Sequence, residues 1–334
     1  MGKVKIEIER RITLKTFFFF IDNHFLKSDS SSVWGTLESE LQKQAVNYKA
    51  EPIHNDRQVE YILKKELNND ALELKNNLVV VSVGSSTFFL EVLTKLRKIS
   101  AQQIPIAFIL INEKNNFANK IGVSSNPLIA LKQILNSVHS ISYNLGSVEN
   151  SLNTDEQIFT DELIVGFRAY VTSLIKSSKF YKLLFKYHLS LIAEFCAMTE
   201  AFINQEAFSV TTRLSQKYNF FKNSFSICIK NHPFLDNEKT KEANNLQLEI
   251  ITSLNPLSYW FILPAKKFNL SSKIPFIHTF EQKQIHLVIN SLEFSQIDSR
   301  QLINKFYDAH LKSFTYPFWF DVDSVSLSEK NNNF

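Results

Sequence analysis

The pattern of apolar and polar positions changes near the middle of the chain. In the first part, short continuous apolar runs alternate with segments whose apolar residues recur every three or four positions. The continuous runs predict strands that are covered on both faces, at 16–21, 78–83 and 106–111. The periodic segments predict helices, at 33–45, 59–67, 88–97 and 127–135. Strands that alternate with helices are typical of the α/β class, with a doubly wound parallel sheet.

Beyond about residue 140, apolar and polar residues alternate with a period of two. This pattern predicts strands at 208–214, 224–230, 246–251, 259–264 and 285–292. Two helical stretches, 171–185 and 188–203, interrupt these strands. Runs of strands with few helices between them favour a mainly antiparallel, β-sandwich-like domain. We therefore expect three parts: an α/β domain over 12–137, a β-rich domain over 138–315, and a C-terminal segment over 316–334 that can pack back on the first domain.

Composition excludes several classes of function. Six glycines occur in 334 residues, and none follows Gly166. The Walker loop and the GxGxxG dinucleotide loop need several glycines close together, so this sequence contains neither motif. Cys196 and Cys228 are too few for a disulfide framework or a Cys-rich metal site, which fits a reducing compartment. A formal net charge of +4 is mild for this length and disfavours a nucleic-acid partner.

The sequence also bears on location. No apolar run approaches the ~20 residues of a membrane span, and the first residues carry both charge signs where a signal peptide would be apolar. We therefore expect a cytoplasmic protein. One segment carries lysines at three- and four-residue steps beside apolar residues: Lys176, Lys179, Lys182 and Lys186. Such a basic amphipathic helix can lie on an anionic membrane surface, or it can pack its apolar face on the core and leave the lysines in water. A lipid or membrane-surface partner, with a position at the membrane periphery, thus stays open.

Segments in both halves share the order and spacing of one known family. The first half contributes 79–96 (VVVSVGSSTFFLEVLTKL), 104–123 (IPIAFILINEKNNFANKIGV) and 126–135 (NPLIALKQIL). The second half contributes 231–234 (NHPF) and 246–251 (LQLEII). In these segments the sequence resembles the bacterial diacylglycerol kinase and lipid kinase family, whose catalytic domain sphingosine kinases share. The resemblance implies a two-domain lipid-kinase-like fold and, in an active member, transfer of a phosphate from ATP with Mg²⁺ to a lipid hydroxyl.

The family's GGDGT loop matches the loop after 78–83 in either of two registers. Without a gap before Thr87 the loop is 83–87, whereas aligning Glu91 with the family's following glutamate makes it 84–88. The resemblance implies a set of nucleotide-binding residues: Gly84, Ser85, Ser86 and Thr87, with Asn115 from the family's Gly-Thr-Gly-Asn-Asp segment. Amides at the start of a helix can contact an anion. The serines are also explained by a helix N-cap, which stabilises a helix by ~1 kcal/mol.

Most acids of the family are replaced at the matching positions. The replacements are Ser85 or Ser86 in the loop, Arg168 in a Gly-Phe-Asp-Ala segment, and Asn244 in an Asp-Gly pair. Arg300 stands where an Asp-Gly-Glu motif has the glutamate that would be the general base. Magnesium prefers carboxylate oxygens, and loss of a general base typically removes ~10²–10⁴ in rate. Asp298 is the acid of that motif that is retained, so it is our catalytic candidate, and we assign no metal site.

Two hypotheses follow. The first is a degenerate member of the family, a pseudokinase with weak or no ATP-dependent lipid phosphorylation that acts in binding or regulation without a cofactor. The alternative is an active lipid kinase that transfers the γ-phosphate of ATP to a diacylglycerol-like hydroxyl, with Mg²⁺. The alternative requires a rebuilt site, with carboxylates drawn from Glu91, Glu113, Asp161 or Glu162.

Overall fold

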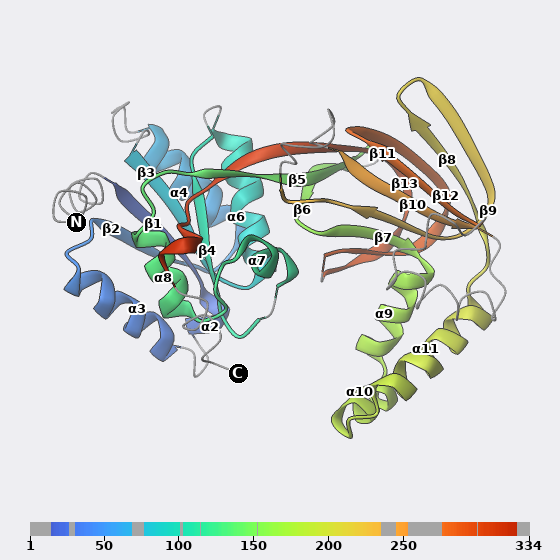
Figure 1. Cartoon of the computed structure of the whole chain (residues 1–334), viewed down its shortest axis with the longest axis horizontal. Coiled ribbons are helices and arrows are strands. Elements are labelled where there is room, and N and C mark those ends of the chain that lie inside the picture. Colours follow the sequence, from blue (N-terminus) through green and yellow to red (C-terminus); the bar gives the residue numbers. More distant parts are fainter. Residues whose placement is uncertain are drawn as a thin grey trace. The chain divides into compact units, whose positions relative to one another are not determined.

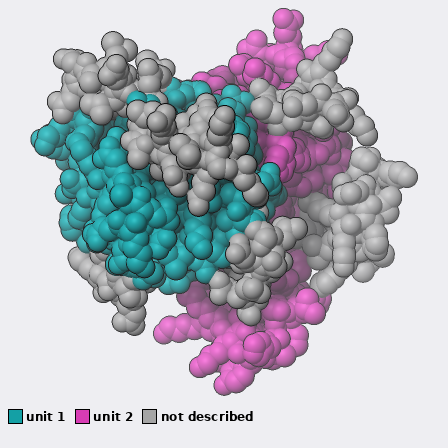
Figure 2. Space-filling model, turned by 60° about the vertical axis from the view of Figure 1, so that its left-hand side comes forward, with its two compact units in different colours: residues 1–143, 315–334 teal, residues 144–314 magenta. Residues whose placement is uncertain are grey.

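The computed structural model describes residues 15–26, 31–68, 77–100, 103–113, 115–151, 153–234, 245–252, 276–298 and 300–325 (Figure 1). The chain divides into two compact units, which Figure 2 shows in different colours. Unit 1 comprises residues 1–143 and 315–334, and unit 2 comprises residues 144–314. The strand predicted at 259–264 and the position Asn244 lie outside the described residues.

Parallel strands form the centre of unit 1. They are β1 (Thr16–Asp22), β2 (Tyr48–Ile53), β3 (Leu78–Gly84) and β4 (Ile106–Leu110), in the order β4-β3-β1-β2. Nearly every residue of β1, β3 and β4 is buried, because side chains on both faces of these strands are covered.

Helices follow the strands of unit 1 and pack in pairs. α3 (Ser31–Lys43) contacts α8 (Pro127–Leu135), and α4 (Asp56–Asn68) contacts α6 (Ser86–Ile99). The short helices are α2 (Asn23–Leu26) after β1 and α7 (Asn116–Ile121) after β4. The mixed α/β fold that the sequence predicts is therefore confirmed.

Aromatic rings fill the core of unit 1. The ring centroid of Phe108 in β4 lies 4.7 Å from that of Phe89 in α6 and 5.1 Å from that of Phe320. Phe318 and Phe320 belong to the end of the chain and are 0% and 2% exposed. The amide of Trp319 donates a hydrogen bond to the carbonyl of Ile106, at 2.8 Å. Residues 318–320 therefore belong to unit 1, since the rings of Phe318 and Phe320 complete that core.

Antiparallel strands make up most of unit 2. They are β5 (Ile141–Asn150), β6 (Asn153–Phe159), β7 (Glu162–Gly166), β8 (Phe208–Leu214), β9 (Lys217–Lys230), β10 (Leu246–Thr252), β11 (Ile277–Gln282), β12 (Gln284–Ile297) and β13 (Arg300–Phe318). β5 begins and β13 ends in unit 1. Both β7 and β8 pair with β9 and with β12, so they lie end to end between these two long strands.

These strands are joined by hydrogen bonds into one sheet. The long strands β9 and β12 contribute to this continuity, because each continues from the partner β8 to the partner β7. The sheet also curls. Asn231, just after β9, donates side-chain hydrogen bonds to the carbonyls of Asn144 in β5, at 2.8 Å, and Thr160, at 2.9 Å. Apolar side chains of most of these strands share a single core.

Three helices lie between β7 and β8 in the chain order. They are α9 (Phe167–Ser177), α10 (Lys179–Lys186) and α11 (Ser190–Asn204). Phe167 of α9 and Phe225 of β9 pack together, with ring centroids 5.2 Å apart. Ala193, Ala197 and Ala201 lie on one face of α11 and are fully buried, so α11 approaches its neighbours closely. No helix in the described parts of the chain is long and apolar enough to cross a membrane.

Candidate functional site

The predicted nucleotide loop lies between β3 and α6. A side chain at position 84 would collide with Asp22 in β1, because a Cβ built on Gly84 lies 2.6 Å from Cβ of Asp22. This close approach explains the glycine without a ligand. Ser85 is the N-cap of α6, and its Oγ accepts a hydrogen bond from the amide of Phe88, at 3.1 Å. Thr87 is exposed on the first turn of the helix.

A carboxylate of the chain itself occupies the start of α6. One oxygen of Glu113 accepts a hydrogen bond from the backbone amide of Ser86, at 2.7 Å, and the other accepts from its hydroxyl, at 2.5 Å. Glu113 lies in the loop that follows β4, the neighbour of β3 in the sheet. The positive end of a helix dipole favours a negative charge at this position. The amide of Ser86, which the sequence suggests for a nucleotide, therefore already holds an anion.

Asn115 also has a partner within the chain. It is the N-cap of α7, and its side-chain oxygen accepts a hydrogen bond from the amide of Ala118, at 3.0 Å. The same short helix ends at Gly122, which adopts a left-handed conformation with φ of 81°. The side chain of Asn115 thus has a defined structural role at the start of α7.

Asp298 joins two turns of unit 2. It lies between β12 and β13 with φ of 48°, and its carboxylate accepts four hydrogen bonds at 2.8–3.0 Å. The donors are the amide and hydroxyl of Thr160 and the amides of Asp161 and Glu162. Burial raises the pKa of Asp298, and these hydrogen bonds oppose the rise. With both oxygens engaged, this carboxylate ties the β12–β13 turn to the turn before β7.

The two arginines at the positions that the resemblance aligns with acids, Arg168 and Arg300, lie in different surroundings. The guanidinium of Arg168 is 3.2 Å from a carboxylate oxygen of Glu162, and it also contacts the sulfur of Cys228, at 3.1 Å. Burial raises the pKa of the Cys228 thiol to about 12. The sequence contains no local signal for this cluster, since its three members come from β7, α9 and β9. Arg300 is exposed at the start of β13.

The carboxylates considered for a rebuilt site belong to both units. Glu91 and Glu113 lie in unit 1, and Asp161 and Glu162 lie in unit 2. Glu113 is held by Ser86, and Glu162 is paired with Arg168. Among the residues that the structure describes, no three His, Cys, Asp or Glu side chains gather as a metal site would require.

Apolar side chains gather on the surface of α10 and α11. Nine of the sixteen exposed large apolar side chains in the described residues lie within 180–203: Phe180, Leu183, Phe185, Tyr187, Leu189, Leu191, Ile192, Phe195 and Ile203. Leu191 is 81% exposed, and within α10 the buried side chain is that of Tyr181. The single helix predicted over 171–185 is wrong, because the extended backbone at Ser178 divides it into α9 and α10. Lys176 therefore lies on α9 and Lys179, Lys182 and Lys186 lie on α10, and all four are exposed. Most of the apolar surface of this helical segment therefore faces outward.

No family model and no curated protein sequence matches this chain. Solved structures match it in fold. One is a Bacillus anthracis str. Sterne protein proposed to be a diacylglycerol kinase, with a TM-score of 0.64 and 12% identity over 93% of this chain and 99% of that one. Another, described as a diacylglycerol kinase from the same organism, has a TM-score of 0.61 and 13% identity over 93% of this chain and 98% of its own. The chain therefore has the fold of these structures.

Proposed function

We propose that this protein is a degenerate relative of the diacylglycerol kinases. It has weak or no ATP-dependent lipid kinase activity, and it acts by binding rather than by phosphorylating a lipid. The observation that carries the proposal is the carboxylate of Glu113 on the amide and hydroxyl of Ser86. Phosphoryl transfer needs amide donors around the phosphates of the nucleotide. Here the backbone amide of Ser86 already donates to the carboxylate of Glu113. The negative charge of that carboxylate repels a phosphate at the same place.

The replaced acids support the same conclusion. A kinase of this kind neutralises the developing charge with a metal ion, which carboxylate oxygens bind best. At the positions that match the family's acids, this chain has the cations Arg168 and Arg300 and the amide Asn244. A cation repels an incoming metal ion and cannot accept a proton from the attacking hydroxyl. Asp298, the acid that is retained, already accepts four hydrogen bonds.

Calorimetric titration with ATP, with and without magnesium, tests this proposal. We expect no magnesium-dependent binding to the unaltered chain, and no ATP-dependent labelling of diacylglycerol in vesicles. The variant Glu113→Ala frees the donors of Ser86 and removes the competing charge, so we expect it to bind ATP more tightly than the unaltered chain. The matched control is Glu60→Ala, whose carboxylate pairs with Lys64 on the surface of the same unit. Magnesium-dependent binding together with lipid labelling by the unaltered chain would refute the proposal and favour the active kinase.

A second function is favoured by the exposed surface of α10 and α11. We infer that this helical segment binds an anionic membrane surface. Exposed apolar side chains would enter the boundary between headgroups and acyl chains, and nearby lysines would attract anionic lipids. Charge complementarity supports this partner, because α10 carries the exposed Lys179, Lys182 and Lys186 and no Asp or Glu, against one exposed acid, Glu194, in α11.

Vesicle sedimentation tests the membrane function. Each lysine near an anionic surface contributes about 1 kcal/mol, so Lys182→Gln/Lys186→Gln is expected to lose about 2 kcal/mol, or roughly 30-fold in partitioning. Phosphatidylcholine vesicles with phosphatidylglycerol are the probe, and vesicles of pure phosphatidylcholine are the lipid control. The matched variant is Lys65→Gln/Lys98→Gln in unit 1, which is expected to bind as the unaltered chain does. Equal binding by both double variants would contradict the assignment to this surface.

A further inference from the structure

A row of cationic and aromatic side chains crosses four neighbouring strands of unit 2. In the register of the sheet, Tyr218 of β9 lies opposite Arg213 of β8, Arg213 lies opposite His286 of β12, and His286 lies opposite His310 of β13. Residues directly opposite each other point to the same face of a sheet. The four side chains therefore form one ladder across the strands.

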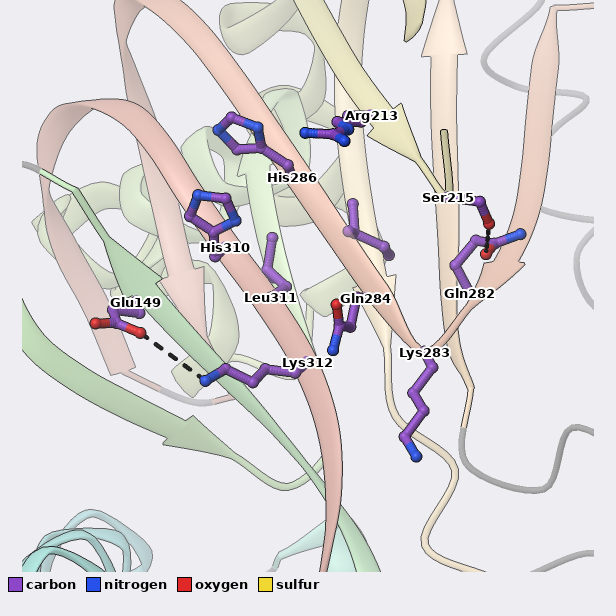
Figure 3. Close-up of a pocket in the computed structure, with 11 residues that line it drawn as sticks. Glu149, Arg213, Ser215, Gln282, Lys283, Gln284, His286, His310, Leu311 and Lys312 are labelled. Atoms are coloured by element: carbon purple, nitrogen blue, oxygen red, sulfur yellow. Dashed lines mark hydrogen bonds and ion pairs between the residues drawn. The ribbon is translucent and has the colours of Figure 1, made fainter. Parts of the chain in front are cut away.

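Contacts within the ladder hold its members close together. The guanidinium carbon of Arg213 lies 5.6 Å from the ring centroid of Tyr218. The rings of His286 and His310 are stacked, with centroids 4.1 Å apart and an interplanar angle of 12°. Figure 3 shows Arg213 extending from its strand toward His286. The imidazole of His286 also contacts the carboxylate of Asp308, at 2.6 Å.

The ladder borders a pocket of about 640 Å³ (Figure 3). The charged side chains that line it are three cations, Arg213, Lys283 and Lys312, and one carboxylate, Glu149. Glu149 is 4.0 Å from Lys312, so these two charges offset each other. No carboxylate of the described residues lies within ion-pair distance of Arg213 or Lys283. The pocket therefore has two cations that are not neutralised by the described part of the chain.

We propose that this pocket binds a phosphate group, with Arg213, His286 and His310 as the residues that hold it. The planar guanidinium of Arg213 supplies paired donors that fit phosphate oxygens, and Lys283, at the other end of the pocket, adds a positive charge to its surroundings. The imidazole rings of His286 and His310 lie on the adjacent strands, and Nε2 of His286 contacts Asp308. Polar side chains at the same opening, Ser215, Gln282 and Gln284, can contact the molecule that carries the phosphate. That molecule is either a soluble phosphate ester or the headgroup of a phosphomonoester lipid.

Binding of inorganic phosphate to the full chain, followed by ³¹P nuclear magnetic resonance, tests the site. Charge-assisted hydrogen bonds to phosphate contribute enough that removing one donor typically weakens binding about tenfold. We therefore expect Arg213→Gln to raise the dissociation constant for phosphate about tenfold, and Lys283→Gln, which removes a more distant charge of the pocket, to raise it less. Lys222→Gln is the matched control, because Lys222 is exposed on β9 and does not line the pocket. Equal affinity for the pocket variants, the control and the unaltered chain would overturn the proposal.

A vesicle experiment distinguishes the two sources of the phosphate. It uses phosphatidylcholine vesicles with and without phosphatidic acid, and every protein carries Lys182→Gln/Lys186→Gln so that α10 contributes little. Loss of binding to phosphatidic acid in Arg213→Gln, with competition by inorganic phosphate, supports the lipid headgroup. Phosphate binding that depends on Arg213, without any effect on vesicles, supports a soluble phosphate ester. Because the kinase and membrane tests use other residues, their failure would leave this result interpretable.

Discussion

Replacement of Asp298 separates a structural role from a catalytic one. Its carboxylate accepts hydrogen bonds from the backbone amides of Thr160, Asp161 and Glu162 and from the hydroxyl of Thr160. Removing the carboxylate leaves three backbone amides without their partner, and an unsatisfied buried donor costs about 1–3 kcal/mol. Because water can reach some of these groups after the change, we expect a total of about 3–5 kcal/mol for Asp298→Ala. That is a large share of the ~5–15 kcal/mol that stabilises a typical domain.

Two further variants divide this loss between the carboxylate and the backbone. Asp298 has a φ of 48°, which asparagine and glycine tolerate better than alanine. Asp298→Asn keeps the shape of the side chain and one acceptor oxygen, so we expect a loss of about 2 kcal/mol. Asp298→Gly relieves the backbone but removes every acceptor. It should therefore still be destabilising if the hydrogen bonds matter more than the strain.

Urea denaturation followed by circular dichroism gives the stabilities, and amide exchange at 160–162 reports the local loss. Glu281→Gln, an exposed position on β11, is the control and should change the stability by no more than about 0.5 kcal/mol. The reasoning is refuted if Asp298→Asn retains full stability and the protection of 160–162, yet abolishes an ATP-dependent labelling of lipid that the unaltered chain performs. That outcome would make Asp298 a catalytic residue.

Three further predictions concern packing and thiol chemistry. Gly84→Ala places a methyl group 2.6 Å from Cβ of Asp22, and we expect a loss of about 1–3 kcal/mol in urea denaturation. Ala197→Leu should cost a similar amount, because Ala197 is fully buried where α11 packs on its neighbours; retained stability would show that α11 is loosely packed. The folded pKa of Cys228, about 12, lies above the ordinary value of 9.0, so the folded thiol holds its proton more tightly than the unfolded one. Its contribution to stability is complete below about pH 9 and is lost as the pH rises toward 12. In a Cys196→Ser background, a thiol reagent at pH 8 should therefore modify Cys228 in urea but not in native buffer; rapid native labelling would contradict this.

Local sequence patterns were enough to predict the mixed α/β fold. The apolar runs at 78–83 and 106–111 became β3 and β4, because short continuous runs rich in β-branched residues are typical of strands covered on both faces. The order of segments also led to the lipid kinase family, whose fold the solved structures share. The sandwich-like arrangement stays a prediction, since periodicity identifies strands but does not tell how they pair. The pairing of β7 and β8 between the same two long strands became apparent only in the sheet register.

Tertiary structure decided what the individual side chains do. Ser86 and Glu113 are 27 residues apart, and Asp298 and Thr160 are 138 residues apart, so no motif links either pair. The ladder from Tyr218 to His310 likewise depends on which strands are neighbours. For α10, the sequence showed an amphipathic helix but not which face is covered, because both outcomes have the same periodicity. Residue types and spacing determine local structure, whereas hydrogen-bond partners and exposure depend on the groups that folding brings from distant parts of the chain.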